Sequence, residues 1–374
     1  MNKIIKILLC IFFIGFISLA GCSLSPLTNL QNNEPENTDI IDSDLIIVGF
    51  SQLGSESDWR TANTKSIQNS LVEKNGFSLI FSNGRQSQEN QIKDVRRFIF
   101  QQVDYILIAP VTETGWDTVL AEAKEAGIPV IIMDRMIDTK DESLYVASVG
   151  TDKYAEGQKA GLWLEKYLTE QKNKDNASME QKSKEDASQG NESLSEETAS
   201  QQENGQNTDT VNIVVLEGTL HSTAQIGRSN GFNDIAGHHT NWNILAHESG
   251  DFTKAKGKEI MAKYLQQFDD IDVLVSQNDD MTFGAIEAIQ EAGLTCGVNG
   301  KIKIISFDAV SEAFDKMEAG LINVDIECNP LQGQQIADII GRLEKGETVD
   351  KVTNLDGKVF EAANASIDRI GRTY

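Results

Sequence analysis

The feature that most constrains this chain is a regular alternation of short apolar runs and helical patterns that starts near residue 45. Strand-like runs and helical patterns alternate in a first series, at Leu45–Phe50, Trp59–Lys74, Phe77–Phe81, Gln91–Gln102, Tyr105–Ala109, Trp116–Ala126 and Val130–Met133. The strand-like runs are mostly apolar along their whole length, and helices separate them. This pattern indicates a parallel sheet that is covered by helices on both faces.

A second series follows the strand-like run Leu144–Val149. Its elements are expected at Lys153–Leu168, Val211–Leu216, Ala224–Ala236, Trp242–Ala246, Thr253–Phe268, Ile271–Ser276, Thr282–Ala292, Ile302–Phe307, Val310–Ala319, Ile322–Ile326 and Gln332–Leu343. Two consecutive series of similar length predict an α/β fold with two doubly wound lobes. A closed (βα)₈ barrel alternates in the same way and is the alternative fold.

Two polar segments stand apart from this alternation. Residues 169–210 are rich in Gln, Asn, Ser, Glu and Lys, with almost no aliphatic and no aromatic side chains. Residues 22–43 are rich in Asn, Pro, Thr and acids. Neither composition can bury enough apolar surface to offset the entropy of ordering. We predict a disordered surface insertion at 169–210 and a flexible tether at 22–43.

The first residues predict an export signal. Lys3 and Lys6 precede an apolar run, Ile7–Ala20, that is too short to span a bilayer. The run closes on Leu19-Ala20-Gly21-Cys22, which resembles the lipobox of bacterial lipoproteins. That resemblance implies cleavage of residues 1–21 and a lipid on Cys22. An ordinary signal with an accidental cysteine is the alternative.

Charge and cysteine content exclude some classes of protein. The formal net charge of −24 argues against nucleic acid as a partner, because binding phosphates needs clustered Lys and Arg. With Cys10 in the signal and Cys22 lipidated, only Cys296 and Cys328 remain to pair. We expect both to be buried free thiols, and we expect neither a metal nor a cofactor.

Polar residues follow the predicted strands of both lobes, at the edge where doubly wound sheets bind ligands. They are Glu56–Arg60, Asp134, Arg135, Glu217–Thr219, Arg228, Gln277–Asp280, Asp308 and Glu327. In the first loop, Glu56, Trp59 and Arg60 supply an acceptor, a flat apolar ring and a fork of donors. This combination suits a small neutral polyol. A capped helix with a solvated first turn is the alternative reading of any one such loop.

Several motifs resemble the sugar-binding proteins of bacterial ABC importers, in the branch that includes ribose- and galactose-type members. They are Val48–Arg60, Gln88–Lys93, Ile108–Val111, Asp134-Arg135, Ser249–Thr253, Lys256–Glu259 and Asn278–Met281. The resemblance runs from about Leu45 to Gly346, and Asp58 stands where the family has a glycine. It implies a type I periplasmic binding protein, with lobes at 44–150 and 151–327, and with hinge crossings, a return to the first lobe and a C-terminal tail in 328–374. It also implies that ten residues contact the sugar: Glu56, Ser57, Trp59, Arg60, Asp134, Arg135, Arg228, Asn278, Asp308 and Glu327.

The same resemblance implies a function and partners. The expected ligand is a hexofuranose or a related neutral monosaccharide, held between lobes that close on it. The expected partners are an ABC permease with its ATPase, and the protein is expected to act as a monomer anchored through Cys22 on the extracytoplasmic face of the membrane. Signalling to a receptor kinase and a soluble regulator are alternatives.

Catalysis is a further alternative. Asp134 and Asp308 could form an acid pair like that of a glycosidase. We expect the neighbouring arginines to hold both ionised, so that neither is a proton donor. The chain is therefore predicted not to be an enzyme.

Overall fold

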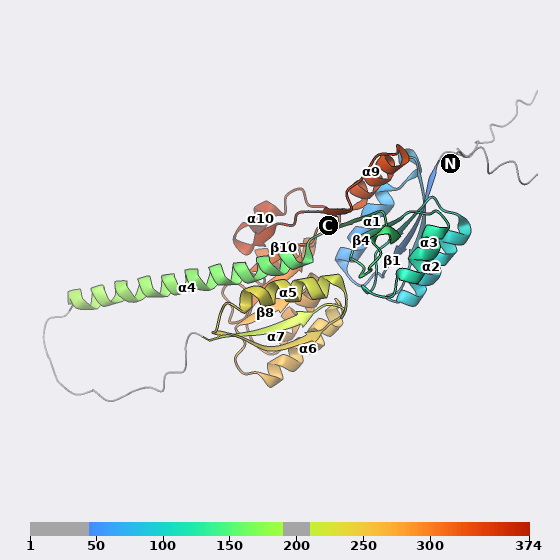
Figure 1. Ribbon diagram of the computed structural model, residues 1–374. Helices are drawn as coiled ribbons and strands as arrows, with labels where there is room; N and C mark the ends of the chain where they lie inside the picture. The colour runs from blue at the N-terminus through green and yellow to red at the C-terminus, as the bar shows by residue number, and fades with distance from the viewer. Residues whose placement is uncertain (1–44, 190–209) are drawn as a thin grey trace, which may run out of the picture. The chain divides into compact units, whose positions relative to one another are not determined.

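The computed structural model describes residues 45–189 and 210–374, and the side chains of 182–189 are not described. The export signal, Cys22 and the tether therefore lie outside the described residues, as does the segment 190–209. Two open sheets organise the remainder (Figure 1). Their strand orders are β2-β1-β3-β4-β5-β11 and β7-β6-β8-β9-β10-β12. Because each sheet has two free edges, the barrel alternative is wrong, and the prediction of two doubly wound lobes is confirmed.

The first lobe contains most of the chain before residue 151. Its elements are β1 (Ile46–Gln52), α1 (Asp58–Ser70), β2 (Phe77–Asn83), α2 (Gln88–Gln101), β3 (Tyr105–Ile108), α3 (Asp117–Glu125), β4 (Val130–Asp134) and β5 (Ala147–Gly150), with short 3₁₀ turns at Glu73–Asn75 and Glu142–Leu144. The strands pair in parallel. Ile67 of α1 packs on one face of the sheet and Phe98 of α2 on the other, so both faces are buried.

The second lobe repeats this order. Its elements are α4 (Lys153–Gln189), β6 (Val211–Glu217), α5 (Thr223–Ala236), β7 (Trp242–Ser249), α6 (Lys254–Gln267), β8 (Val273–Ser276), α7 (Asp279–Glu291), β9 (Lys303–Asp308), α8 (Ser311–Glu318) and β10 (Val324–Glu327). Leu164 of α4 and Phe232 of α5 bury one face, whereas Tyr264 of α6 and Phe314 of α8 bury the other.

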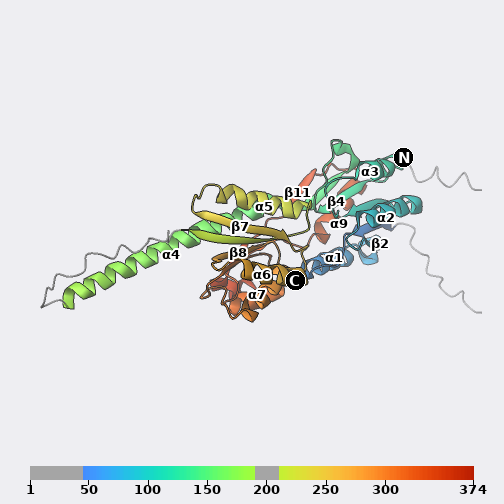
Figure 2. The same ribbon diagram turned by 90° about the horizontal axis from the view of Figure 1, so that it is seen from below.

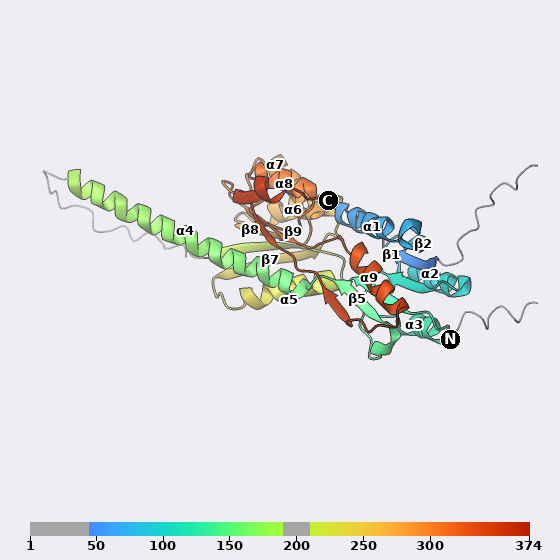
Figure 3. The same cartoon turned by 90° about the horizontal axis from the view of Figure 1, so that it is seen from above.

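The end of the chain belongs to both lobes. Helix α9 (Gly333–Glu344) and strand β11 (Val352–Asn354) return to the first lobe, where β11 pairs with β5. Figure 3 shows α9 beside α1. Strand β12 (Val359–Glu361) then pairs antiparallel with β10, and a 3₁₀ turn (Ala362–Asn364) and α10 (Ala365–Asp368) follow in the second lobe. The chain thus crosses between lobes three times, after β5, after β10 and after β11.

Helix α4 corrects the prediction of disorder throughout 169–210. It continues to Gln189, and its far end runs out beyond α5 and β7 (Figure 2). Residues 162–189 contain no Gly or Pro and are rich in Lys, Glu and Gln, which favour helix. The packed first half of α4 supplies the nucleus, so each further residue adds a hydrogen bond without a new nucleation cost. Composition alone did not reveal this continuation.

Two other expectations can be compared with the described residues. Cys296 and Cys328 are free and buried, as predicted. Among residues 45–189 and 210–374, no helix is long and apolar enough to cross a membrane.

Candidate functional site

The loop after β1 is organised by a helix cap. Ser57 has extended backbone, and its side chain accepts a hydrogen bond from the backbone N–H of Arg60 at 3.1 Å, so that α1 begins at Asp58. This cap places Trp59 and Arg60 in the first turn of α1, and both are buried. The indole N–H of Trp59 donates to the backbone carbonyl of Cys328 at 2.5 Å, next to the second crossing between the lobes. The cap of α1 therefore fixes the positions of Trp59 and Arg60, and the N–H of Trp59 links this turn to the chain at the second crossing.

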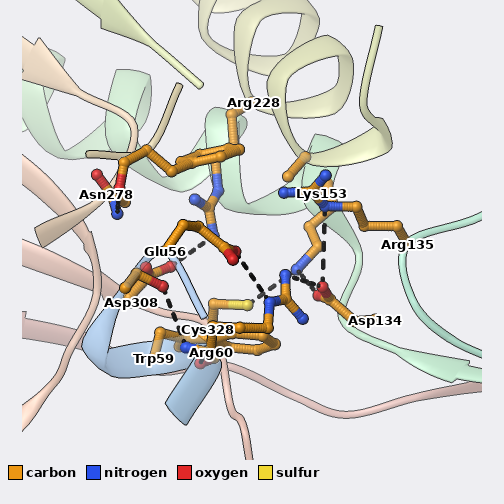
Figure 4. Close-up of a pocket in the computed structure, with 13 residues that line it drawn as sticks. Glu56, Trp59, Arg60, Asp134, Arg135, Lys153, Arg228, Asn278, Asp308 and Cys328 are labelled. Carbon is orange, nitrogen blue, oxygen red and sulfur yellow. Dashed lines mark hydrogen bonds and ion pairs between the residues drawn. The ribbon is translucent and has the colours of Figure 1, made fainter. Parts of the chain in front are cut away.

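Side chains from both lobes line one pocket with about 290 Å³ of space between them (Figure 4). The lining residues are Glu56, Ser57, Trp59, Arg60, Asp134, Arg135, Lys153, Ala224, Arg228, Phe252, Asn278, Asp308 and Cys328. Nine of the ten residues singled out from the sequence are in this set.

Glu327 is the predicted residue that the structure places elsewhere. Its carboxylate accepts hydrogen bonds from Arg372 at 2.8 Å, from the hydroxyl of Tyr374 at 2.7 Å and from the backbone N–H of Lys358 at 2.9 Å. Successive side chains of an extended chain point to opposite sides. Cys328, one residue later, therefore lines the pocket, whereas Glu327 points to the other side.

Sequence reasoning also missed Lys153, Ala224 and Phe252. Phe252 lies within the motif Ser249–Thr253, but no role was predicted for it. It lies in a turn with positive φ, and its ring presses against Gly218, where a Cβ would be only 1.8 Å from the ring. Only glycine at position 218 leaves room for this ring. Lys153 resembled an ordinary helix start, and no pattern in the sequence marked it.

Arg60 and Lys153 join the acids of the first lobe. Arg60 pairs with Glu56 at 3.0 Å and with Asp134 at 2.7 Å, and Lys153 is 3.3 Å from Asp134. Burial alone would raise the pKa of Asp134, but the positive charges of Arg60, Lys153 and Arg135 lower it below its usual range. Asp134 is therefore ionised, as the sequence analysis expected.

Arg228 joins the acids of the second lobe. It pairs with Glu156 at 2.7 Å and with Asp308 at 2.9 Å. Burial raises the pKa of Asp308 well above its ordinary value, and this effect outweighs the opposing charge of Arg228. The expectation that a neighbouring arginine would keep Asp308 ionised is not supported.

Three buried polar atoms of the described pocket residues have no hydrogen-bond partner in the protein: Glu56 Oε2, Arg60 Nη1 and Arg135 Nε. Leaving such a group without a partner costs about 1–3 kcal/mol. One acceptor and two donors, beside the rings of Trp59 and Phe252, match a ligand that has both hydroxyl groups and C–H faces.

Asn278 combines the two alternatives considered from the sequence. Its side-chain oxygen accepts from the backbone N–H of Met281 at 3.0 Å and so caps α7. Its side-chain amide donates to the carbonyl of Phe252 at 3.2 Å. Asn278 therefore lines the pocket while it holds the turn that carries Phe252.

A Gly-x-Ser-x-Gly pattern also occurs, at Gly227–Gly231. In hydrolases this pattern forms a sharp turn between a strand and a helix. Here it lies inside α5, and Ser229 donates to Glu217 at 2.9 Å and accepts from Gln277 at 2.8 Å. The pattern therefore does not form a nucleophile elbow.

Contacts between the lobes border the pocket. The backbone N–H of Asp58 donates to Asp280 at 3.2 Å, and the backbone N–H of Met136 donates to the hydroxyl of Thr223 at 2.8 Å. Burial, and next the charge of Asp58, raise the pKa of Asp280 to about 7. The lobes are thus in contact, and the carboxyl group of Asp280, whose pKa is near neutral pH, lies at this contact.

Comparison with known proteins gives consistent matches. Residues 48–348 match the family described as periplasmic binding protein domain. The chain is 38% identical to the galactofuranose-binding protein YtfQ of Escherichia coli over 312 residues, which is 82% of this chain and 85% of that protein. It is 29% identical to the fructose import binding protein FruE of Bifidobacterium longum over 342 residues, 89% of this chain and 90% of that protein.

Two solved structures at 37% identity also match. One is the periplasmic binding protein component of the arabinose ABC transporter from Shewanella sp. ANA-3, bound to α- and β-L-arabinofuranose, with a TM-score of 0.73, covering 86% of this chain and 94% of that one. The other, from Mycobacterium smegmatis in complex with β-D-fucofuranose, has a TM-score of 0.74 and covers 86% of this chain and 93% of that one. Both sequence relatives are named as binding proteins and not as enzymes.

Proposed function

Because this chain belongs to the periplasmic binding protein domain family over residues 48–348, we propose that it captures a monosaccharide in a five-membered ring form between its two lobes. Galactofuranose or a closely similar furanose is the favoured ligand, because relatives at 37–38% identity are named for, or bound to, furanoses. The family membership confirms the resemblance found in the sequence motifs.

One observation carries this proposal. The three unpartnered atoms, Glu56 Oε2, Arg60 Nη1 and Arg135 Nε, belong to a pocket that both lobes line. A sugar hydroxyl can donate to the carboxylate oxygen and accept from the two guanidinium groups. Arg60, Lys153 and Arg228 are already paired with acids, so a neutral ligand fits better than an anion. A ligand that touches both lobes stabilises the closed state by its differential affinity.

The membrane partners are part of the same proposal. We infer that Cys22 carries a lipid which anchors the protein on the extracytoplasmic face, and that the closed, monomeric protein delivers the sugar to an ABC permease with its ATPase. The lipobox-like Leu19-Ala20-Gly21-Cys22 supports the anchor. Metabolic labelling with an alkyne fatty acid tests it, because Cys22→Ser should abolish labelling and Cys10→Ser should leave labelling unchanged. Loss of labelling in Cys10→Ser would instead mean that Cys10 is the modified residue.

Ring size can be tested directly with two anhydro sugars. In 1,4-anhydrogalactitol the ring is locked with five members, and in 1,5-anhydrogalactitol it is locked with six. A thermal-shift assay should show stabilisation by the five-membered ring alone, by about 2.7 kcal/mol at one hundred times its dissociation constant. Preference for the six-membered ring would overturn the furanose assignment. Loss of affinity as salt rises would instead indicate an anionic sugar.

A further inference from the structure

Behind the pocket, the second lobe buries two carboxyl groups that the proposed binding step does not use. Asp279 is the first residue of α7, and Asp325 lies in β10, where it pairs in register with Ser306 of β9. Both side chains are fully buried. Asp308, two residues after Ser306, lines the pocket. The two acids therefore lie directly behind a residue that faces the ligand.

Both acids hold the turn that follows Asp308. Asp308 has a φ of 106° and Ala309 a φ of 59°, a left-handed conformation that residues other than glycine seldom adopt. Such strain persists only where neighbouring groups fix it. Asp325 accepts from the backbone N–H of Ala309 at 3.0 Å, and Asp279 accepts from the backbone N–H of Val310 at 2.8 Å. The side chain of Val310 makes no capping hydrogen bond for α8, so Asp279 takes that role.

The surroundings of Asp279 and Asp325 indicate that this pair of carboxyl groups carries a proton. No lysine or arginine of the described residues lies within ion-pair distance of either acid: Arg228 pairs with Asp308, and Arg372 pairs with Glu327. Burial first, and then the charge of Asp325, raise the pKa of Asp279 well above its ordinary value. Burial also raises the pKa of Asp325 to about 7, although a hydrogen bond to Asp279 lowers it; the charge of Asp308 adds to the rise and the charge of Arg372 opposes it. Two buried carboxyl groups that interact with each other, without a cation to pair with, cannot both be ionised.

We propose that Asp279 and Asp325 share one proton, and that this carboxyl pair positions Asp308 for sugar binding by holding the 308–310 turn. The role in sugar binding rests on the function proposed above. Asp279 and Asp325 are positioning residues, because neither lines the pocket.

The hydrogen bonds indicate which acid donates. Asp279 already accepts at both oxygens, from Ser306 at 2.6 Å and from Val310 at 2.8 Å. Asp325 accepts at Oδ1 from Ala309, whereas its Oδ2 has no partner. The hydrogen bond between the two carboxyl groups raises the pKa of Asp279 and lowers that of Asp325, so the shared proton lies on Asp279, and Oδ2 of Asp325 is free to accept it. An amide at position 325 can still accept from Ala309 and can bond to Asp279 without any titratable proton of its own, whereas alanine can do neither.

The test compares Asp325→Asn, Asp325→Ala and Asp279→Ala in the purified protein. Without ligand, the amide hydrogen-exchange protection of Ala309 and Val310 reports the turn. Asp325→Asn should keep that protection, Asp325→Ala should lose it at Ala309, and Asp279→Ala should lose it at Val310. With 1,4-anhydrogalactitol as the probe, the two alanine variants should bind more than tenfold more weakly, and Asp325→Asn should stay within about threefold of wild type.

A pH profile separates proton sharing from simple packing. A pKa raised in the folded state gives stability that is present at low pH and is lost as pH rises through the folded value. Asp325→Asn should therefore make the fall in unfolding free energy between pH 5 and pH 8 shallower. Asp272→Asn is the matched control, because Asp272 also accepts from a backbone N–H, that of Asn212 at 2.8 Å, and should leave the slope unchanged.

Three outcomes would overturn the inference: Asp325→Asn as damaging to the turn as Asp325→Ala, an unchanged pH slope in Asp325→Asn, or full sugar affinity in both alanine variants. If the wild-type protein binds no furanose, the proposed function fails instead. Hydrogen exchange and the pH profile of the free protein still decide the role of the acid pair in that case.

Discussion

Arg60 and Arg135 both line the pocket, yet the protein stabilises the positive charge of Arg60 alone. Arg60 pairs with two acids, and although burial disfavours its charge, Asp134 and Glu56 together raise its pKa. Arg135 is 3.9 Å from Asp134, and burial, with the repulsion of Arg60, lowers its pKa to about 10. The free protein thus keeps Arg135 in an unfavourable position, which is expected of a residue that serves the ligand.

This contrast predicts opposite effects of two substitutions. Arg60→Ala leaves Glu56 and Asp134 buried with fewer partners, so it should lower the unfolding free energy by about 3–5 kcal/mol. Arg135→Ala should leave stability unchanged or slightly higher and yet abolish measurable sugar binding. Denaturant unfolding and calorimetry of both variants check the pair. A large loss of stability in Arg135→Ala would contradict this view.

Trp59 combines a ring in the pocket with an N–H bond to the chain at the second crossing. Trp59→Ala should weaken sugar binding by more than tenfold, because about 1.5–3 kcal/mol of apolar burial is lost. Trp59→Phe keeps a ring but loses the bond to the carbonyl of Cys328, and it should bind with intermediate affinity. Equal affinity of wild type and Trp59→Ala, by calorimetry, would assign Trp59 to packing alone.

Residue types in the sequence predicted much of this pocket, because acids, amides and arginines after strands are visible as a pattern. They could not identify Lys153, which enters from the start of α4, because a lysine there looks like an ordinary first turn. They also could not show that Cys328 lines the pocket while Glu327 points away from it, because neighbouring side chains of an extended chain lie on opposite sides. The sequence thus predicted which residue types line the pocket, but not the direction in which a side chain points beyond the end of a strand.

At the scale of elements, the alternation of apolar runs was sufficient to predict the central strands and the packed helices. The short strands β11 and β12 were missed. Each has three residues, partly exposed, and forms only by pairing with the edge of an existing sheet. The far half of α4 was missed for a different reason, since its helix propagates from a packed half without burying an apolar face of its own.

Removing that far half should test whether it matters to the lobe. Leu168 packs against the second lobe, and Leu168 and Val211 line the same surface hollow. A short Gly-Ser linker in place of 171–208 should therefore reconnect the chain, with stability and sugar affinity nearly unchanged and helical circular dichroism reduced. Loss of binding in a folded variant would show that this segment takes part in ligand capture.

At the scale of the whole molecule, two lobes were readable from the two series of elements. A return of the chain end to the first lobe was implied by the family resemblance, but the pairing of the last strands was not predicted. Helix α9 was predicted, but nothing local in its sequence shows that it packs on α1 while β12 returns to the second sheet. Such placements depend on which sheet edge and which helix face remain uncovered after the rest of the chain has folded.

The contact between the lobes predicts that sugar affinity depends on pH. Asp280 of the second lobe faces Asp58 and Glu56 of the first and is near Glu312 of its own lobe, and its pKa in the closed form is about 7. In an open form these lobes separate, so its pKa should move back toward the ordinary aspartate value. Closure then takes up a proton at neutral pH. The contribution of this proton to closure is full below about pH 4 and is lost as pH rises through about 7.

Calorimetry with 1,4-anhydrogalactitol between pH 5 and pH 8.5 should therefore show affinity falling as pH rises. Asp280→Asn removes the repelling charge and can still accept from the N–H of Asp58, so it should bind more tightly than wild type at pH 8 and give a shallower profile. Asp270→Asn, which removes a surface partner of Lys301, should retain the wild-type profile. Affinity that rises with pH, or an unchanged slope in Asp280→Asn, would mean that this carboxyl does not report closure of the lobes.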